Sequence, residues 1–68
     1  MEFGEKLQKI RKEHNMTQEQ LAEKLYISRT AISKWESNRG YPNLDTLKDI
    51  AKIFNITIDD LLSSEKII

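Results

Sequence analysis

Two helix starts stand eleven residues apart in the middle of the chain, and this spacing limits the fold more than any other feature. Thr17 and Gln20 fit a capping box, in which the Thr17 hydroxyl accepts from the amide three residues on and Gln20 reaches back. Ser28 is a second good N-cap. The pattern predicts a helix over about 18–25, a connection of three or four residues, and a helix over about 29–37. So short a connection forces a steep angle between the two helices.

The segment 18–37 has one apolar side. Two helices that pack steeply across a short turn need a small residue where their backbones come closest, and Ala22 supplies it. In the helix over 29–37, Ile32 and Trp35 share one side at i, i+3, so its polar residues fall on the opposite side. The segment therefore buries one face and presents the other. Its inward positions hold Leu21, Ala22, Leu25, Ile27, Ile32 and Trp35.

Three further helices are indicated outside this segment. They are predicted over about Glu2 to His14, over about 44–54, and in a short stretch that starts near Ile58. Asn is common where a helix ends because it tolerates the left-handed backbone conformation. Asn15 and Asn55 stand at two such ends, and Asn43 is the expected N-cap of the helix over 44–54. The apolar residues of the three helices are Phe3, Leu7 and Ile10, then Leu44, Leu47, Ile50, Ala51 and Phe54, then Leu61 and Leu62.

The composition fits one helical domain. With 68 residues, 2 Gly and 1 Pro, the chain is too short for two domains and too poor in turn residues for a β-sandwich. It has no Cys and a single His, so no metal site, cofactor, small-molecule substrate or enzymatic activity is expected. No apolar run reaches the roughly 20 residues of a membrane span, and residues 1–5 lack the start of a signal peptide. A cytoplasmic location is expected.

The order of the motifs resembles a known family. The matching stretches are Leu7 with 10–12, then 17–25, 27–36, 42–47 and 54–62. Through them the chain resembles the Cro and phage-repressor type of helix-turn-helix, the XRE-like regulators, over nearly its whole length from Phe3 to Leu62. The resemblance implies an all-α fold: a compact five-helix lambda-repressor-like domain in which helices two and three form the helix-turn-helix. It also implies double-stranded DNA as the partner, with helix three in the major groove.

The resemblance assigns DNA contacts to particular residues. The positions that match base contacts in helix three are Arg29, Thr30, Ser33 and Lys34. The positions that match phosphate contacts are Gln18, Ser28, Asn38 and Arg39. These residue types suit the task, because Arg grips guanine O6 and N7 bidentately, Lys reaches guanine or phosphate, and Thr offers a hydroxyl and a methyl group. Phosphate contacts position the protein, whereas base contacts specify the sequence.

Three more positions can be interpreted from the resemblance. Arg11 and Glu36 match a partly buried ion pair that ties helix one to the end of helix three, which is a structural role. Tyr26 departs from the family, since the turn between helices two and three most often has Gly there. Two alternatives follow for this turn. Either Tyr26 adopts a strained left-handed backbone, or the turn has another geometry.

The resulting hypothesis is a sequence-specific transcriptional regulator, a repressor that occludes a promoter. One copy has few base-reading side chains, so a homodimer on a palindromic operator is expected, with its recognition helices one DNA turn, roughly 34 Å, apart. The alternative, from another class of function, is a helical protein-interaction module such as an antitoxin-like partner.

Residues 1–63 are expected to form the helix-turn-helix domain and residues 64–68 a tail. Two alternatives remain for the apolar ending, which comprises Ile58, Leu61, Leu62, Ile67 and Ile68. Part of it makes a dimer contact, or the tail begins a linker to a further domain.

The formal net charge is zero, with 11 basic and 11 acidic residues, but the charges are unevenly spread. From Lys6 to Arg39 there are eight basic residues and four acidic ones, and the rest of the chain has three and seven. A partner senses this local distribution and not the sum. The sequence thus predicts a basic half that faces phosphate and an acidic half that points away. The acidic half carries Asp45, Asp49, Asp59 and Asp60.

Overall fold

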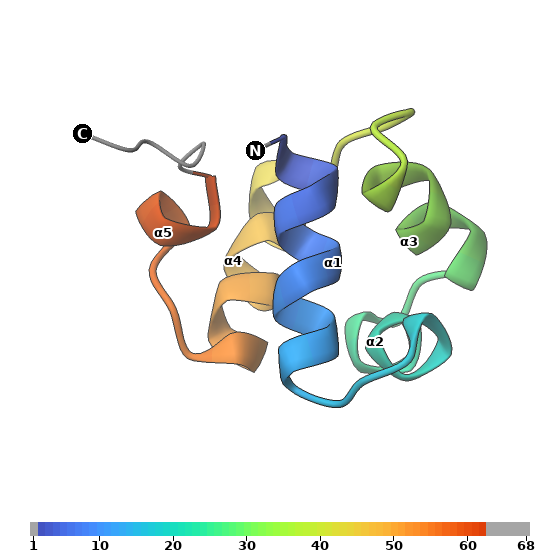
Figure 1. Cartoon of the computed structure of the whole chain (residues 1–68), viewed down its shortest axis with the longest axis horizontal. Helices are drawn as coiled ribbons and strands as arrows, with labels where there is room; N and C mark the ends of the chain where they lie inside the picture. Colours follow the sequence, from blue (N-terminus) through green and yellow to red (C-terminus); the bar gives the residue numbers. More distant parts are fainter. Residues whose placement is uncertain (1, 63–68) are drawn as a thin grey trace.

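A computed structural model of the chain describes residues 2–62, which form five helices and no strand (Figure 1). The helices are α1 (Phe3–Glu13), α2 (Gln18–Leu25), α3 (Arg29–Glu36), α4 (Leu44–Phe54) and α5 (Ile58–Leu62). The predicted all-α class and the number of helices are confirmed. The predicted ends differ by one residue at Glu2, His14 and Ser37, because these residues are caps in the structure. The predicted tail, 64–68, lies outside the described residues.

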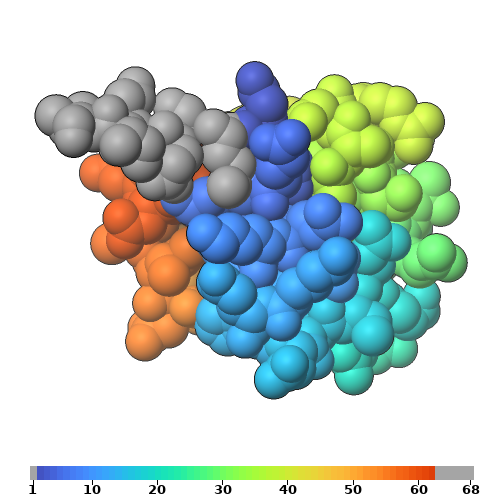
Figure 2. Space-filling model, in the orientation of Figure 1, coloured from blue at the N-terminus to red at the C-terminus, as the bar shows by residue number. Residues whose placement is uncertain are grey.

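Helix α1 lies in the middle of the domain. In Figures 1 and 2, α4 and α5 lie on one side of it, and α2, α3 and the loop after α3 lie on the other. Every helix sends one completely buried side chain into the shared core, so the core joins both sides. These five side chains are Leu7, Leu21, Ile32, Ile50 and Leu61. The acidic residues of the predicted acidic half are all exposed on α4 and α5, across α1 from α3.

The helix starts are where the sequence places them. The Thr17 hydroxyl accepts from the Gln20 amide at 3.0 Å, and the Thr17 amide donates to Gln20 Oε1 at 2.8 Å, which completes the capping box. Ser28 Oγ accepts from the Ala31 amide at 3.2 Å. Asn43 caps α4 in the same way, at 2.9 Å from the Thr46 amide. Each bond satisfies one backbone donor that the helix itself leaves free.

Left-handed backbone follows each of the first four helices. Asn15, Asn38 and Asn55 have φ values of 55°, 61° and 58°, and Asn accepts this region at little cost. The fourth such residue is Tyr26, with φ 59° and ψ 41°. Of the two alternatives for the turn, the left-handed one is therefore correct. Tyr26 is 95% exposed, so no packing of its ring offsets the backbone conformation.

Gly4 allows α1 and α3 to touch, which the sequence did not reveal. A Cβ atom at Gly4 would lie 2.5 Å from the Trp35 carbonyl oxygen and 2.6 Å from that of Glu36. The N-terminal turn of α1 thus meets the C-terminal carbonyls of α3, an arrangement that also brings opposite ends of two helix dipoles together. Asn38 completes the contact, because its Oδ1 accepts from the Gly4 amide at 3.0 Å.

The prediction that Leu44 belongs to the apolar side of α4 is wrong. Leu44 is 58% exposed, because it is the first residue of the helix and stands beyond the reach of the core. Close by, the loop before α4 is anchored by buried Pro42 and by the ring of Tyr41, whose centroid lies 4.8 Å from that of Phe3. Within the predicted apolar ending, Leu61 is fully buried and Leu62 is 40% exposed. Ile67 and Ile68 lie outside the described residues.

Candidate nucleic-acid interface

Helix α3 has the two faces that its sequence predicts. Ile32 is completely buried, and Trp35 is half-buried against the core. On the other side Arg29, Thr30 and Lys34 are exposed, and half-buried Ser33 lies between them. The first two residues of α3 and Ser33 line one shallow hollow. The structure thus brings the four predicted base-contacting residues to one face.

The loop after α3 is fixed by side-chain hydrogen bonds. Ser37 Oγ donates to the Ser33 carbonyl oxygen at 2.8 Å and accepts from Arg39 Nε at 3.0 Å. Asn38 is held to α1 through Gly4, as described above. Arg39, predicted as a phosphate contact, therefore extends from a braced loop at the end of α3, whereas the Oδ1 of Asn38, the other predicted phosphate contact of this loop, is bonded to α1. The structural role of Asn38 was missed, because no local pattern indicates a bond between residues 34 positions apart.

A surface hollow extends from the first turn of α2 to the first residue of α3. It is lined by residues of both helices and by the loop that joins α1 to α2. Its lining residues are Arg11, Lys12, Asn15, Met16, Thr17, Gln18, Glu19 and Arg29. Free amides at a helix N-terminus favour anions, and Lys12 and Arg29 add positive charge to this hollow. Ser28, the N-cap of α3, is exposed one residue before Arg29.

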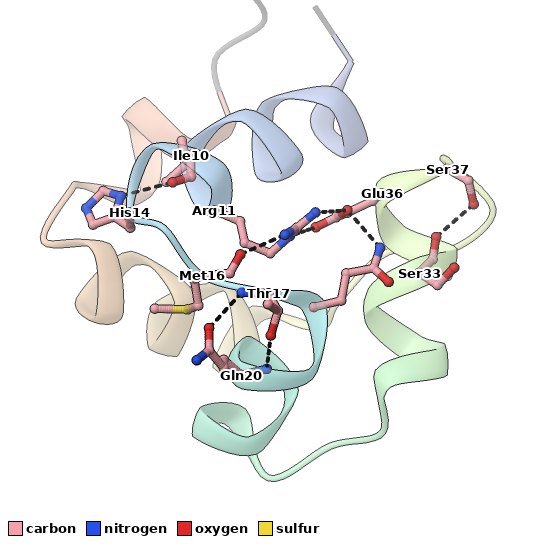
Figure 3. A network of polar contacts seen from close by, with 10 residues as sticks. Ile10, Arg11, His14, Met16, Thr17, Gln20, Ser33, Glu36 and Ser37 are labelled. Atoms are coloured by element: carbon pink, nitrogen blue, oxygen red, sulfur yellow. Dashed lines mark hydrogen bonds and ion pairs between the residues drawn. The ribbon is translucent and has the colours of Figure 1, made fainter.

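A buried ion pair joins α1 to the end of α3 (Figure 3). Arg11 Nε donates to Glu36 Oε2 at 2.6 Å and Arg11 Nη2 donates to Glu36 Oε1 at 3.1 Å, a bidentate arrangement. The two side chains are 8% and 3% exposed. Arg11 Nη1 also donates to the Met16 carbonyl oxygen at 2.7 Å, and Gln18 Nε2 donates to Glu36 Oε1 at 3.0 Å. The pair thus holds α1, the loop before α2, α2 and α3 together.

His14 lies at the C-terminal end of α1 and packs against α4. It is the C-cap residue of the helix, and its Nδ1 lies 2.9 Å from the Ile10 carbonyl oxygen. Its ring packs against Phe54, with centroids 4.8 Å apart. The sequence predicted that the helix would end at His14, and the structure ends it one residue earlier with His14 as the cap.

Comparison with known families decides the class of this domain. Residues 7–61, most of the chain, match the family described as Helix-turn-helix. The chain belongs to this helix-turn-helix family. Its relatives include phage repressors and other regulators, as expected for the XRE-like type.

Two relatives resemble this helix-turn-helix chain along all of its 68 residues. One is the HTH-type transcriptional activator BcrR of Enterococcus faecalis, 66% identical and matched over 33% of its own length. The other is the immunity repressor protein of Bacillus phage phi105, 37% identical and matched over 47% of its length. The chain therefore spans less than half of each relative.

A solved structure supports the fold independently. The DNA-binding domain of the P22 c2 repressor superposes with a TM-score of 0.84 at 28% identity, and the match covers 97% of this chain and 92% of that one. The lambda-repressor-like class predicted from the sequence is thus confirmed. No helix among residues 2–62 is long and apolar enough to cross a membrane.

Proposed function

We propose that the chain is the DNA-binding domain of a sequence-specific transcriptional regulator that acts in the cytoplasm and has no enzymatic activity of its own. One observation carries the proposal. Four polar side chains of α3 share the face opposite its buried residues, so they are free to enter a major groove. Membership in the helix-turn-helix family and the regulators among its relatives support the same conclusion.

The contacts divide by position along the motif. The proposed base contacts are Arg29, Thr30, Ser33 and Lys34, and the proposed phosphate contacts are Gln18, Ser28, Asn38 and Arg39. In this arrangement α3 lies in the groove while the start of α2 and the loop after α3 approach the two flanking strands. The braced loop supports this, because an immobilised side chain loses less conformational freedom when it binds.

We further propose a homodimer on a palindromic operator and repression as the regulatory outcome. One copy offers few base contacts, each worth about 1–3 kcal/mol of discrimination, so two half-sites are needed for useful specificity. Activation is a second candidate outcome, because the relative that is 66% identical is named as an activator. Residues 1–63 are proposed as the domain, and 64–68 as the start of a connection to the rest of a longer regulator.

Selection of duplexes from a random-sequence pool tests the proposal. The expected result is enrichment of an inverted repeat whose half-sites lie about one helical turn apart, with affinity that falls steeply as salt rises. The double variant Arg29→Ala, Lys34→Ala should fold normally and enrich no sequence. If wild type and the double variant both leave the pool unchanged at low salt, the DNA-binding proposal fails. The protein-interaction module then becomes the better hypothesis.

A further inference from the structure

We propose that Glu36, although it is buried, sets the orientation of the Gln18 side chain and thereby controls a DNA phosphate contact. Glu36 is a positioning residue in this view, since it acts only through Gln18. The inference rests on the proposed function, because it assumes that Gln18 meets a phosphate. It gives the carboxylate of Glu36 a second role besides its ion pair with Arg11.

The amide of Gln18 has two ends that differ in what they can bind. Its Nε2 carries two donors and its Oε1 accepts only, so only the Nε2 end can bind a phosphate oxygen. Gln18 Nε2 donates one hydrogen to Glu36 Oε1 at 3.0 Å. A rotation of the amide by half a turn would place its carbonyl oxygen against a carboxylate oxygen, which is repulsive. Glu36 therefore excludes the wrong orientation and leaves the second N–H of Nε2 available for DNA.

The carboxylate is itself held firmly and neutralised. Its two oxygens accept two hydrogen bonds from Arg11 and one from Gln18, and the side chain of Glu36 is 3% exposed. Because Arg11 balances its charge, a negative group can stand beside the proposed phosphate position without strong repulsion. Arg11 also holds the Met16 carbonyl oxygen, two residues before Gln18. The Arg11 guanidinium thus holds both the Glu36 carboxylate, which accepts from the Gln18 amide, and the backbone that leads to Gln18.

The test uses a variant that removes the acceptor and keeps the fold and the net charge. The double variant Arg11→Met, Glu36→Leu replaces the buried pair by apolar side chains, an exchange that is often neutral or stabilising. This double variant is compared with Gln18→Ala alone and with the triple variant that combines all three substitutions. Ile50→Val, in the core of α4, is the control for a modest loss of stability away from the network. Melting curves of wild type and all variants determine a temperature at which every one of them is folded.

Binding of each protein to one short mixed-sequence duplex is then measured at that temperature. We expect Gln18→Ala and the double variant each to weaken binding by about tenfold, as for loss of a hydrogen bond to a charged group. The triple variant should lose no more than about twofold beyond either, because both changes remove the same contact. Ile50→Val should bind as wild type does. Binding by the double variant equal to wild type, or losses that multiply in the triple variant, would overturn the inference.

Two outcomes separate this inference from the proposed function. If wild type binds no duplex even at low salt, the proposed function fails. If wild type binds and Gln18→Ala has no effect, the function stands and the positioning role is wrong.

Nuclear magnetic resonance of the free domain adds a readout without DNA, since the side-chain amide protons of Gln18 should exchange slowly in wild type. In the double variant we expect fast exchange, and slow exchange there would contradict the role of Glu36.

Discussion

Replacement of Tyr26 by Asn should stabilise the domain. Tyr26 has φ 59° and ψ 41°, a conformation that costs an ordinary L-residue about 1–2 kcal/mol and costs Asn less. Its side chain is 95% exposed, so its removal sacrifices no buried contact. The expected gain is about 1 kcal/mol. For a domain of this size that raises the melting temperature by about 4–8 °C, which thermal unfolding followed by circular dichroism can measure.

Two matched variants isolate the backbone as the cause. Tyr26→Ala also removes the exposed ring but keeps a Cβ without the local hydrogen bonding of Asn, so it should leave the melting temperature nearly unchanged. Asn55→Tyr makes the reverse exchange after α4, where φ is 58° and ψ is 45°, and should destabilise by about the same 1 kcal/mol. If Tyr26→Asn melts no higher than Tyr26→Ala, backbone strain at this turn is not the explanation.

Three further predictions concern the contacts between helices and the DNA face. Gly4→Ala should destabilise by about 1–3 kcal/mol, because its Cβ would overlap the carbonyls that end α3; an unchanged melting temperature would refute the close approach. Glu36→Ala should cost about 3–5 kcal/mol by stranding Arg11 as a buried charge, whereas Arg29→Ala should melt like wild type and lose site-specific binding. Exchange of Arg39 for Ala should weaken binding to all duplexes alike and lower the salt slope by about one unit, as gel-shift titrations at several salt concentrations would reveal.

Much of the fold was accessible from local patterns, because helix boundaries depend on nearby residues. Thr17, Ser28 and Asn43 are N-caps whose hydrogen bonds reach only three residues along the chain, so the sequence alone indicates them. Leu44 was misassigned for the complementary reason. Its spacing fits the stripe of α4, but its burial depends on where the first turn of that helix stands relative to α1, and no local pattern reports that.

The candidate site was predictable only in part. The exposed face of α3 follows from helical periodicity, since Ile32 and Trp35 fix which side is buried. The pair of Arg11 and Glu36 came from the resemblance to the family and not from spacing. The bond between Gly4 and Asn38 was not foreseen, because it forms only after α1 has docked against α3. Contacts of this kind require the relative placement of helices, which a single sequence does not encode in any short motif.

The hydrogen bond between Gly4 and Asn38 also has a consequence for where other molecules should be attached to the protein. A fluorophore, surface or fusion partner joined ahead of Glu2 starts beside the loop that carries Arg39, where it would crowd an approaching duplex. Helix α5 lies across α1 from α3 (Figure 1), so a partner joined after it starts on the far side. Immobilisation through a group joined after α5 should therefore preserve access to α3.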